Sequence, residues 1–138
     1  TSALVTGSTT MPRDDSIPQN DEGIEMLTLA ITPTSSSSVL VIILTAMSVA
    51  AEAAQSSMAL FQDTTANALA ASGLYNGTAN GPNNHSLIHT MVAGTTSSTT
   101  FKMRIGANSG AIRINGDSGG RDFGGVASTS IVIFEYTP

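Results

Sequence analysis

The order of apolar and polar positions along the chain predicts a succession of short β-strands. In residues 99–106 the apolar side chains of Phe101, Met103 and Ile105 alternate with polar ones, which is the pattern of a strand with one face in a core. Residues 128–136 alternate in the same way, and we expect Ile131 and Ile133 to point inward. Residues 39–49 are apolar on both faces at first, with Val41 and Ile43 expected in the core, so this run predicts a central strand covered on both sides.

Weaker runs and turn signals complete the pattern. We predict an edge strand in residues 2–8, an ordered loop over 11–23, and further strands in 24–31, 85–93 and 111–114. Proline and glycine mark the connections. Residues 66–72 form a short alanine-rich segment, and the Asn-Gly and Gly-Pro pairs in residues 73–84 predict a long exposed loop.

Residues 46–61 allow two interpretations. Met47, Ala51, Ala54, Met58 and Phe61 recur at helical spacing, and alanine is the best helix former. The same residues also fit a strand, a loop at residues 52–57, and a second strand from Met58 to Gln62. Periodicity alone leaves both open.

With eight to ten short strands and no repeat or linker, the chain predicts one all-β domain over residues 1–138. We expect an antiparallel β-sandwich of the jelly-roll type, in which residues 1–23 supply an edge strand and an ordered loop and residues 24–138 form the sandwich. The sequence has no initiator Met. We therefore expect either a complete processed domain or the C-terminal piece of a longer chain.

Composition narrows the possible functions. Charged residues make up 11% of the chain, whereas Ser and Thr together account for 36 of 138 residues. A net charge of −5 with five basic residues gives no electrostatic footprint for nucleic acid. The longest apolar run has six residues, Val39 to Leu44, too few to insert in a membrane. There is no Cys, so disulfides and thiol chemistry are excluded.

No group of residues predicts catalysis, a metal or a cofactor. His85 and His89 would share one face of a strand, but roughly 13 Å apart, which is too far for one ion. We interpret both as surface or interface imidazoles. Asp14 with Asp15 and Asp117 with Asp122 are more simply explained by turns than as a pair of catalytic carboxylates. We therefore expect a protein without enzymatic activity.

Several segments in order resemble the C-terminal domains of bacteriophage tail fibres and related virion appendages. The likeness covers nearly the whole chain. The segments are residues 11–23 (MPRDDSIPQNDEG), 29–34 (LAITPT), 59–71 (ALFQDTTANALAA), 89–96 (HTMVAGTT), 100–106 (TFKMRIG), 114–116 (ING) and 123–135 (FGGVASTSIVIFE).

The resemblance implies a compact jelly roll, similar to tumour-necrosis-factor and C1q-like heads, that assembles as a homotrimer on a phage particle. It favours strands over a helix in residues 46–62. The implied role is structural or adhesive, in a tail fibre or spike tip, with other virion proteins and a host surface glycan or protein as partners. A capsid decoration (head fibre) protein and a bacterial carbohydrate-binding module are the alternatives.

Exposed loops are the candidate receptor site, because loops on a rigid scaffold carry recognition. Two segments qualify, residues 75–84 and 117–123. Their amide, aromatic and charged side chains offer donors, acceptors and a ring face to a partner. The candidate receptor-loop residues are Tyr75, Asn76, Asn80, Asp117, Arg121 and Phe123.

Overall fold

The computed structural model describes residues 1–137 and is almost entirely β-structure. One short 3₁₀ helix, η1 (Asp122–Gly125), interrupts the strands. The strands are β1 (Val5–Gly7), β2 (Ile24–Ile31), β3 (Val39–Ala50), β4 (Gln55–Gln62), β5 (Ala70–Tyr75), β6 (Pro82–Val92), β7 (Thr99–Ala107), β8 (Ile112–Ile114), β9 (Gly116–Asp117), β10 (Gly120–Arg121) and β11 (Ser130–Tyr136).

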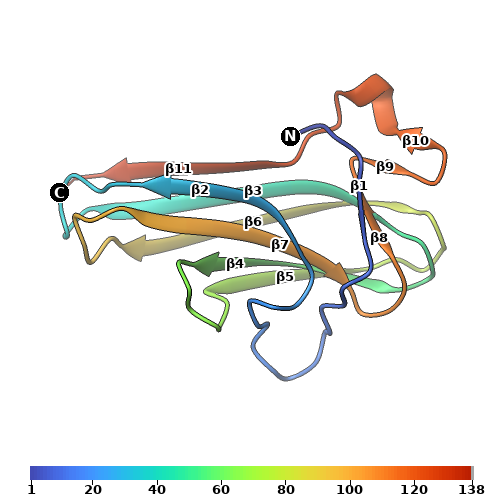
Figure 1. The fold of residues 1–138 in the computed structure, drawn as a ribbon, viewed down its shortest axis with the longest axis horizontal. Helices are drawn as coiled ribbons and strands as arrows, with labels where there is room; N and C mark the ends of the chain where they lie inside the picture. Colours follow the sequence, from blue (N-terminus) through green and yellow to red (C-terminus); the bar gives the residue numbers. More distant parts are fainter. Residues whose placement is uncertain (138) are drawn as a thin grey trace.

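Two antiparallel sheets pack as a sandwich (Figure 1). The first sheet is built on β3, which pairs with β6 along one side. On its other side β3 pairs with β11 over residues 39–45 and with β8 over residues 48–50, and β1 adds to β8 as an edge strand. The second sheet has the order β2-β7-β4-β5, and β9 and β10 form a separate hairpin. The predicted all-β antiparallel sandwich is therefore confirmed.

The core lies between the sheets and is filled by alternate residues of each strand. Phe101, Met103 and Ile105 of β7 are fully buried, and Ile131 and Ile133 of β11 pack against the same cluster. These five positions confirm the inward faces predicted from the period of two.

The inward face of β3 is the opposite of the one expected. Leu40, Ile42 and Leu44 are fully buried, whereas Val41 and Ile43 point to the other side of the sheet and are only half-buried. A strand that is apolar on both faces gives no signal of which face is inward, because the alternation that fixes its orientation is missing. The prediction that both faces are covered is wrong for this chain alone.

Residues 46–62 form strands and no helix, as the resemblance favoured. The connection is shorter than expected, because β3 continues to Ala50 and β4 begins at Gln55. The predicted long loop at residues 73–84 is wrong: residues 70–75 form β5 and Pro82 begins β6, which leaves only residues 76–81 as a loop. Pro82 is tolerated because it is the first residue of its strand.

The N-terminal loop (residues 8–23) packs on the outer face of the second sheet. Met11 is fully buried there with Ala59 and Phe61, and its amide donates to the Ala107 carbonyl oxygen at 2.9 Å. Gly23, at φ +61°, closes the loop, and a Cβ there would lie 2.7 Å from the Ile105 carbonyl oxygen. The ordered loop predicted for residues 11–23 is confirmed and covers part of the outer face.

Within residues 1–137, no helix is long and apolar enough to span a membrane.

Candidate functional site

On β6, β3 and β11 the outward side of the first sheet is an exposed apolar surface without a charged side chain. Strand register places these residues together, because Ile43 pairs with Ile88 on one side and with Val132 on the other. Ile88 is 67% exposed and Phe134 is 49% exposed. We call this surface the apolar face; its members are Val39, Val41, Ile43, Ile88, Val92, Val132, Phe134 and Tyr136.

The outer side of the second sheet carries charge, whereas on the first sheet the outward charge is Arg113 of β8, beyond the apolar face. Lys102 and Arg104 point outward from the second sheet, and Arg104 pairs with Glu25 at 3.5 Å. Arg104 also donates to the carbonyl oxygens of Glu22 and Gly23, at 2.7 and 2.8 Å, which holds the end of the N-terminal loop. The two outer sides thus differ: the second sheet has charges and a covering loop, and the apolar face on β6, β3 and β11 has neither.

A short arm rises beside one end of the apolar face. We call residues 116–127 the arm; it contains β9, β10 and η1. Its base is Asn115, which is fully buried at φ +63°. The Asn115 side-chain nitrogen donates to the carbonyl oxygens of Thr1 and Ala3, at 3.2 and 3.1 Å, and its side-chain oxygen accepts from the Thr129 hydroxyl at 3.0 Å. The backbone N–H of Asn115 also donates to the Met47 carbonyl oxygen at 3.0 Å, so the arm is fixed to β3.

The tip of the arm holds an aromatic ring in the solvent on an unusual backbone. Phe123, Gly124 and Gly125 have φ values of +49°, +65° and +91°. Glycine adopts such values freely, but a residue with a Cβ loses about 1–2 kcal/mol there. A Cβ at Gly125 would lie 2.6 Å from Nη1 of Arg121, so the Arg121 side chain would have to move to admit it. Phe123 is nevertheless 74% exposed.

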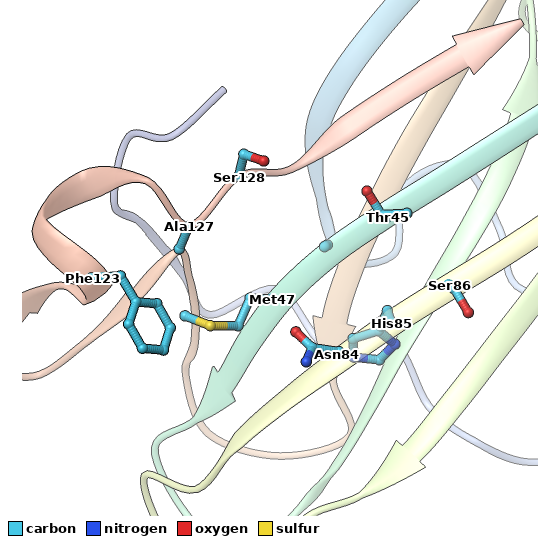
Figure 2. Close-up of a pocket in the computed structure, with 9 residues that line it drawn as sticks. Thr45, Met47, Asn84, His85, Ser86, Phe123, Ala127 and Ser128 are labelled. Atoms are coloured by element: carbon cyan, nitrogen blue, oxygen red, sulfur yellow. The ribbon is translucent and has the colours of Figure 1, made fainter.

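The arm and the first sheet border an open hollow of about 360 Å³ (Figure 2). Phe123 and Met47 lie on one side of it, and Asn84 and Ser86 of β6 on the other. We call it the arm hollow; its remaining lining residues are Thr45, Ala46, His85, Ala127 and Ser128. No lining side chain is an Asp, Glu, Lys or Arg. The hollow therefore combines one aromatic ring with neutral amide and hydroxyl groups.

The candidate residues of the 75–84 segment divide into exposed and buried ones. Tyr75 at the end of β5 is exposed, and Asn80 is exposed in the short loop, where its side-chain oxygen accepts from Nη1 of Arg113 at 3.2 Å. Asn76 is only 6% exposed, and its side-chain nitrogen donates to the Gly81 carbonyl oxygen. The expectation of an exposed Asn76 is wrong, because its amide closes the turn.

The candidate residues of the 117–123 segment all lie in the arm. The Asp117 carboxylate accepts from the Gly119 amide at 2.6 Å, which is a turn contact. Arg121 is exposed and lies beneath the glycines of the tip. Phe123 is the candidate that lines the hollow. The other lining residues Thr45, Met47 and Ser86 were not predicted, because they lie on strands and belong to no motif. Only their outward position on β3 and β6 distinguishes them from core residues.

His85 lies between the sheets and not on the surface. It is 3% exposed, and its Nε2 is 3.0 Å from the hydroxyl oxygens of both Ser48 and Ser56. Its Nδ1 has no hydrogen-bond partner among the described residues. Burial lowers the pKa of His85 to about 4. The interpretation of His85 as a surface imidazole is therefore wrong; His89 shares its face of β6 and is half-buried.

Among residues 1–137 no three His, Asp or Glu side chains are grouped so that they could hold a metal ion. The arm hollow, the apolar face and the buried His85 cluster are the three features that the sequence reasoning had not located.

Comparison with known proteins gives a family and a few distant structures. No curated protein matches the sequence. One solved structure that resembles it is the C-terminal domain of EclA, described as a sugar-binding protein: identity is 15%, the match covers 94% of this chain and 76% of that one, and the TM-score is 0.44. Another is the enzymatically active domain of tailspike protein 4 of bacteriophage CBA120. Its identity is 16%, the match covers 80% of this chain and 16% of that one, and the TM-score is 0.33.

The family comparison covers almost the whole chain. The profile of the family described as the Pgp3 C-terminal domain matches residues 8–138. The match takes in the N-terminal loop, both sheets and the arm. This family match does not test the resemblance to phage appendages, which stays a prediction. The chain belongs to the Pgp3 C-terminal domain family.

Proposed function

We propose that this domain is a non-enzymatic head domain that assembles with copies of itself through the apolar face, as a homotrimer, and presents the arm end of the sandwich to an external partner. The observation that carries the proposal is the uncharged, exposed apolar face on β6, β3 and β11. Monomeric soluble proteins rarely leave a contiguous apolar surface of this kind uncovered.

The energetic argument follows from the side chains of that face. Full burial of a large aliphatic or aromatic side chain contributes roughly 1.5–3 kcal/mol. The apolar face has eight such side chains, all partly or largely exposed in one chain. Their joint burial offsets an association cost of about 4–15 kcal/mol. Since the neighbouring outward residues are Ser and Thr, no charge has to be desolvated.

A second copy is the partner that fits best. Homo-oligomers with closed symmetry are the commonest assemblies, and a surface without charge gives no electrostatic signal for a charged partner. The three-fold symmetry is taken from the resemblance to trimeric appendage heads. The same resemblance supports the virion location and the contacts with other virion proteins and a host surface, and these belong to the proposal with it.

The test is the mass of the assembly in solution. Light scattering at micromolar concentration is expected to give about three times the chain mass of 14.0 kDa. Ile88→Glu places a charge in the centre of the apolar face and is expected to yield folded monomers. Ile17→Glu is the matched control, because Ile17 is also exposed but lies in the N-terminal loop; its assembly is expected to be unchanged.

Two results would overturn the proposal in different ways. A wild-type mass of one chain removes self-assembly altogether. A mass of two chains keeps the apolar face as an interface but contradicts the three-fold symmetry.

A further inference from the structure

We propose that the arm hollow binds one ring of a neutral sugar, with the ring stacked on Phe123 and its hydroxyls bonded to the amide and hydroxyl groups of β3 and β6. The inference deepens the proposed function, on which it rests: a head domain without catalysis needs a recognition site, and this assigns one. The adhesive partner is then a glycan and not a protein.

The first argument is the backbone of the arm tip. Phe123 adopts a left-handed conformation that is costly for a residue with a Cβ, and two glycines at positive φ follow it. The ring is 74% exposed, so packing within the chain regains little of that cost. Backbone strain kept at a surface position points to a role for the side chain there. The position of the ring against the arm hollow supplies that role (Figure 2).

The second argument is the chemistry of the lining. A sugar ring has an apolar C–H face and a rim of hydroxyls, each of which donates and accepts. Phe123 and Met47 offer the apolar contact, and Asn84 and Ser86, both exposed, offer amide and hydroxyl groups that donate and accept as well. The Thr45 hydroxyl is oriented by a 2.7 Å hydrogen bond with Ser130.

The third argument is charge and size. The lining has no Asp, Glu, Lys or Arg side chain, and the His85 ring that contributes to the wall is turned inward toward Ser48 and Ser56. An acidic or basic ligand would lose its hydration without gaining an ion pair. A volume of about 360 Å³ is at the small end of ligand sites, which suits a single ring.

The hollow is also held rigid. Asn115 fixes the arm to β3, to the N-terminal residues and to Thr129 through the hydrogen bonds described above. The Asp122 amide donates to the Asn115 carbonyl oxygen at 3.1 Å, which places η1 directly on this base. A preformed site does not have to be ordered on binding, which favours recognition of a small ligand. Repetition of the site in an assembly would strengthen attachment to a surface that bears many sugars.

The experiment measures binding of simple sugars to the full 138-residue chain. The probes are the methyl glycosides of glucose, galactose, mannose and N-acetylglucosamine, with glucuronic acid and N-acetylneuraminic acid as acidic counterparts, followed by ligand-observed NMR. At least one neutral glycoside is expected to bind with millimolar affinity, independent of salt. Phe123→Ala is expected to weaken it about tenfold, and Phe123→Tyr to retain it.

Two further variants separate recognition from a structural role. Phe123→Gly relieves the strained backbone, so its melting temperature is expected to equal or exceed that of the wild type while binding is lost. Val126→Ala is the matched control, since Val126 is 79% exposed in the same arm but does not line the hollow; its binding is expected to be unchanged.

Each other outcome overturns the inference. These are no binding of any neutral glycoside, stronger binding of the acidic sugars, a loss of stability in Phe123→Gly, or loss of assembly in Phe123→Ala, which would make the hollow part of an interface between copies. Assembly is measured on the same samples. A wild-type monomer that binds a sugar through Phe123 contradicts the proposed assembly and leaves this inference standing.

Discussion

His85 is expected to make the folding stability of this domain depend on pH. The imidazole is 3% exposed, and its Nε2 lies 3.0 Å from two serine hydroxyls. A protonated ring carries an N–H at both nitrogens, and one of them, Nδ1, has no hydrogen-bond partner among the described residues. The buried ring therefore favours its neutral form, and burial lowers the pKa to about 4 from the ordinary 6.5.

The sign and size of the effect follow from linkage. Because the unfolded chain binds the proton more readily, the contribution of His85 is complete above pH 6.5 and is lost as the pH falls from 6.5 to 4. Between pH 7.5 and 4.5 the free energy of unfolding should fall by about 2.5 kcal/mol from this group. Hydrogen bonds from Ser16 lower the pKa of Asp14. Hydrogen bonds from Thr34 lower the pKa of Glu135. Both carboxylates lie at the surface, and their contributions to stability are lost only as the pH falls through and below their ordinary pKa values of 3.8 and 4.5.

The assay is denaturant unfolding at several pH values and one fixed protein concentration, since the stability of an assembly depends on concentration. His85→Gln keeps a polar side chain at the site and removes its titration. The variant is expected to be less stable at pH 7.5 but to lose most of the slope between pH 6.5 and 4.5. An equal slope in the variant and the wild type would refute the assignment to His85, and a flat wild-type profile would refute the buried neutral imidazole.

Two further changes test the core and the arm. Phe101→Ala removes a fully buried ring and is expected to lower the free energy of unfolding by about 3–5 kcal/mol. Lys102→Ala, on the outward side of β7, should change that free energy by less than about 0.5 kcal/mol. Equal effects of the two substitutions in denaturant unfolding would contradict the assigned inward face of β7. Asn115→Ala removes three side-chain hydrogen bonds and puts an alanine at φ +63°, so it should lower the free energy of unfolding by about 2–4 kcal/mol. It should also make the arm susceptible to limited proteolysis. An arm that stays resistant would show that Asn115 does not anchor it.

Much of the sandwich could be predicted because most strands carry a one-sided pattern. The alternation in β7 and β11 located both the strands and their inward faces, and the proline and glycine signals located most of the connections. The pattern failed where it was absent. On β3 both faces are apolar, so the expectation that Val41 and Ile43 were inward had no basis in alternation, and the structure places Leu40 and Ile42 there instead.

Turn residues misled the prediction between β5 and β6. Asn76, Gly77, Asn80, Gly81 and Pro82 fall within seven residues, and their density predicted a long exposed loop. In the structure they form one compact turn. Asn80 adopts φ +59° there, and its backbone N–H donates to the Ala50 carbonyl oxygen at 2.9 Å. Turn propensity identifies that a chain reverses but not how many residues the reversal takes, because the flanking strands extend as far as their pairing allows.

The candidate site was predictable only in part. Phe123 stood out as a lone aromatic in a glycine-rich segment, but the other walls of the arm hollow are side chains of ordinary strands. Thr45, Asn84 and Ser86 are brought to Phe123 by the register of β3 with β6 and by the path of the arm across β3. Both are long-range properties that no local pattern encodes.

The two proposals meet on one strand and can be separated along it. β3 changes its lateral neighbour from β11 to β8 after Thr45, and at Met47 the Asn115 amide takes the place of a strand partner. The outward residues before that point, Val39 to Ile43, have β11 beside them and form part of the apolar face. Thr45, the last residue of β3 that pairs with β11, and Met47, which follows the change, both line the hollow beside the arm. The change of neighbour opens room for a ligand next to a surface suited to a second copy. Substitutions of the outward residues Val39, Val41 and Ile43 should therefore affect assembly, and those of Thr45 and Met47 sugar binding.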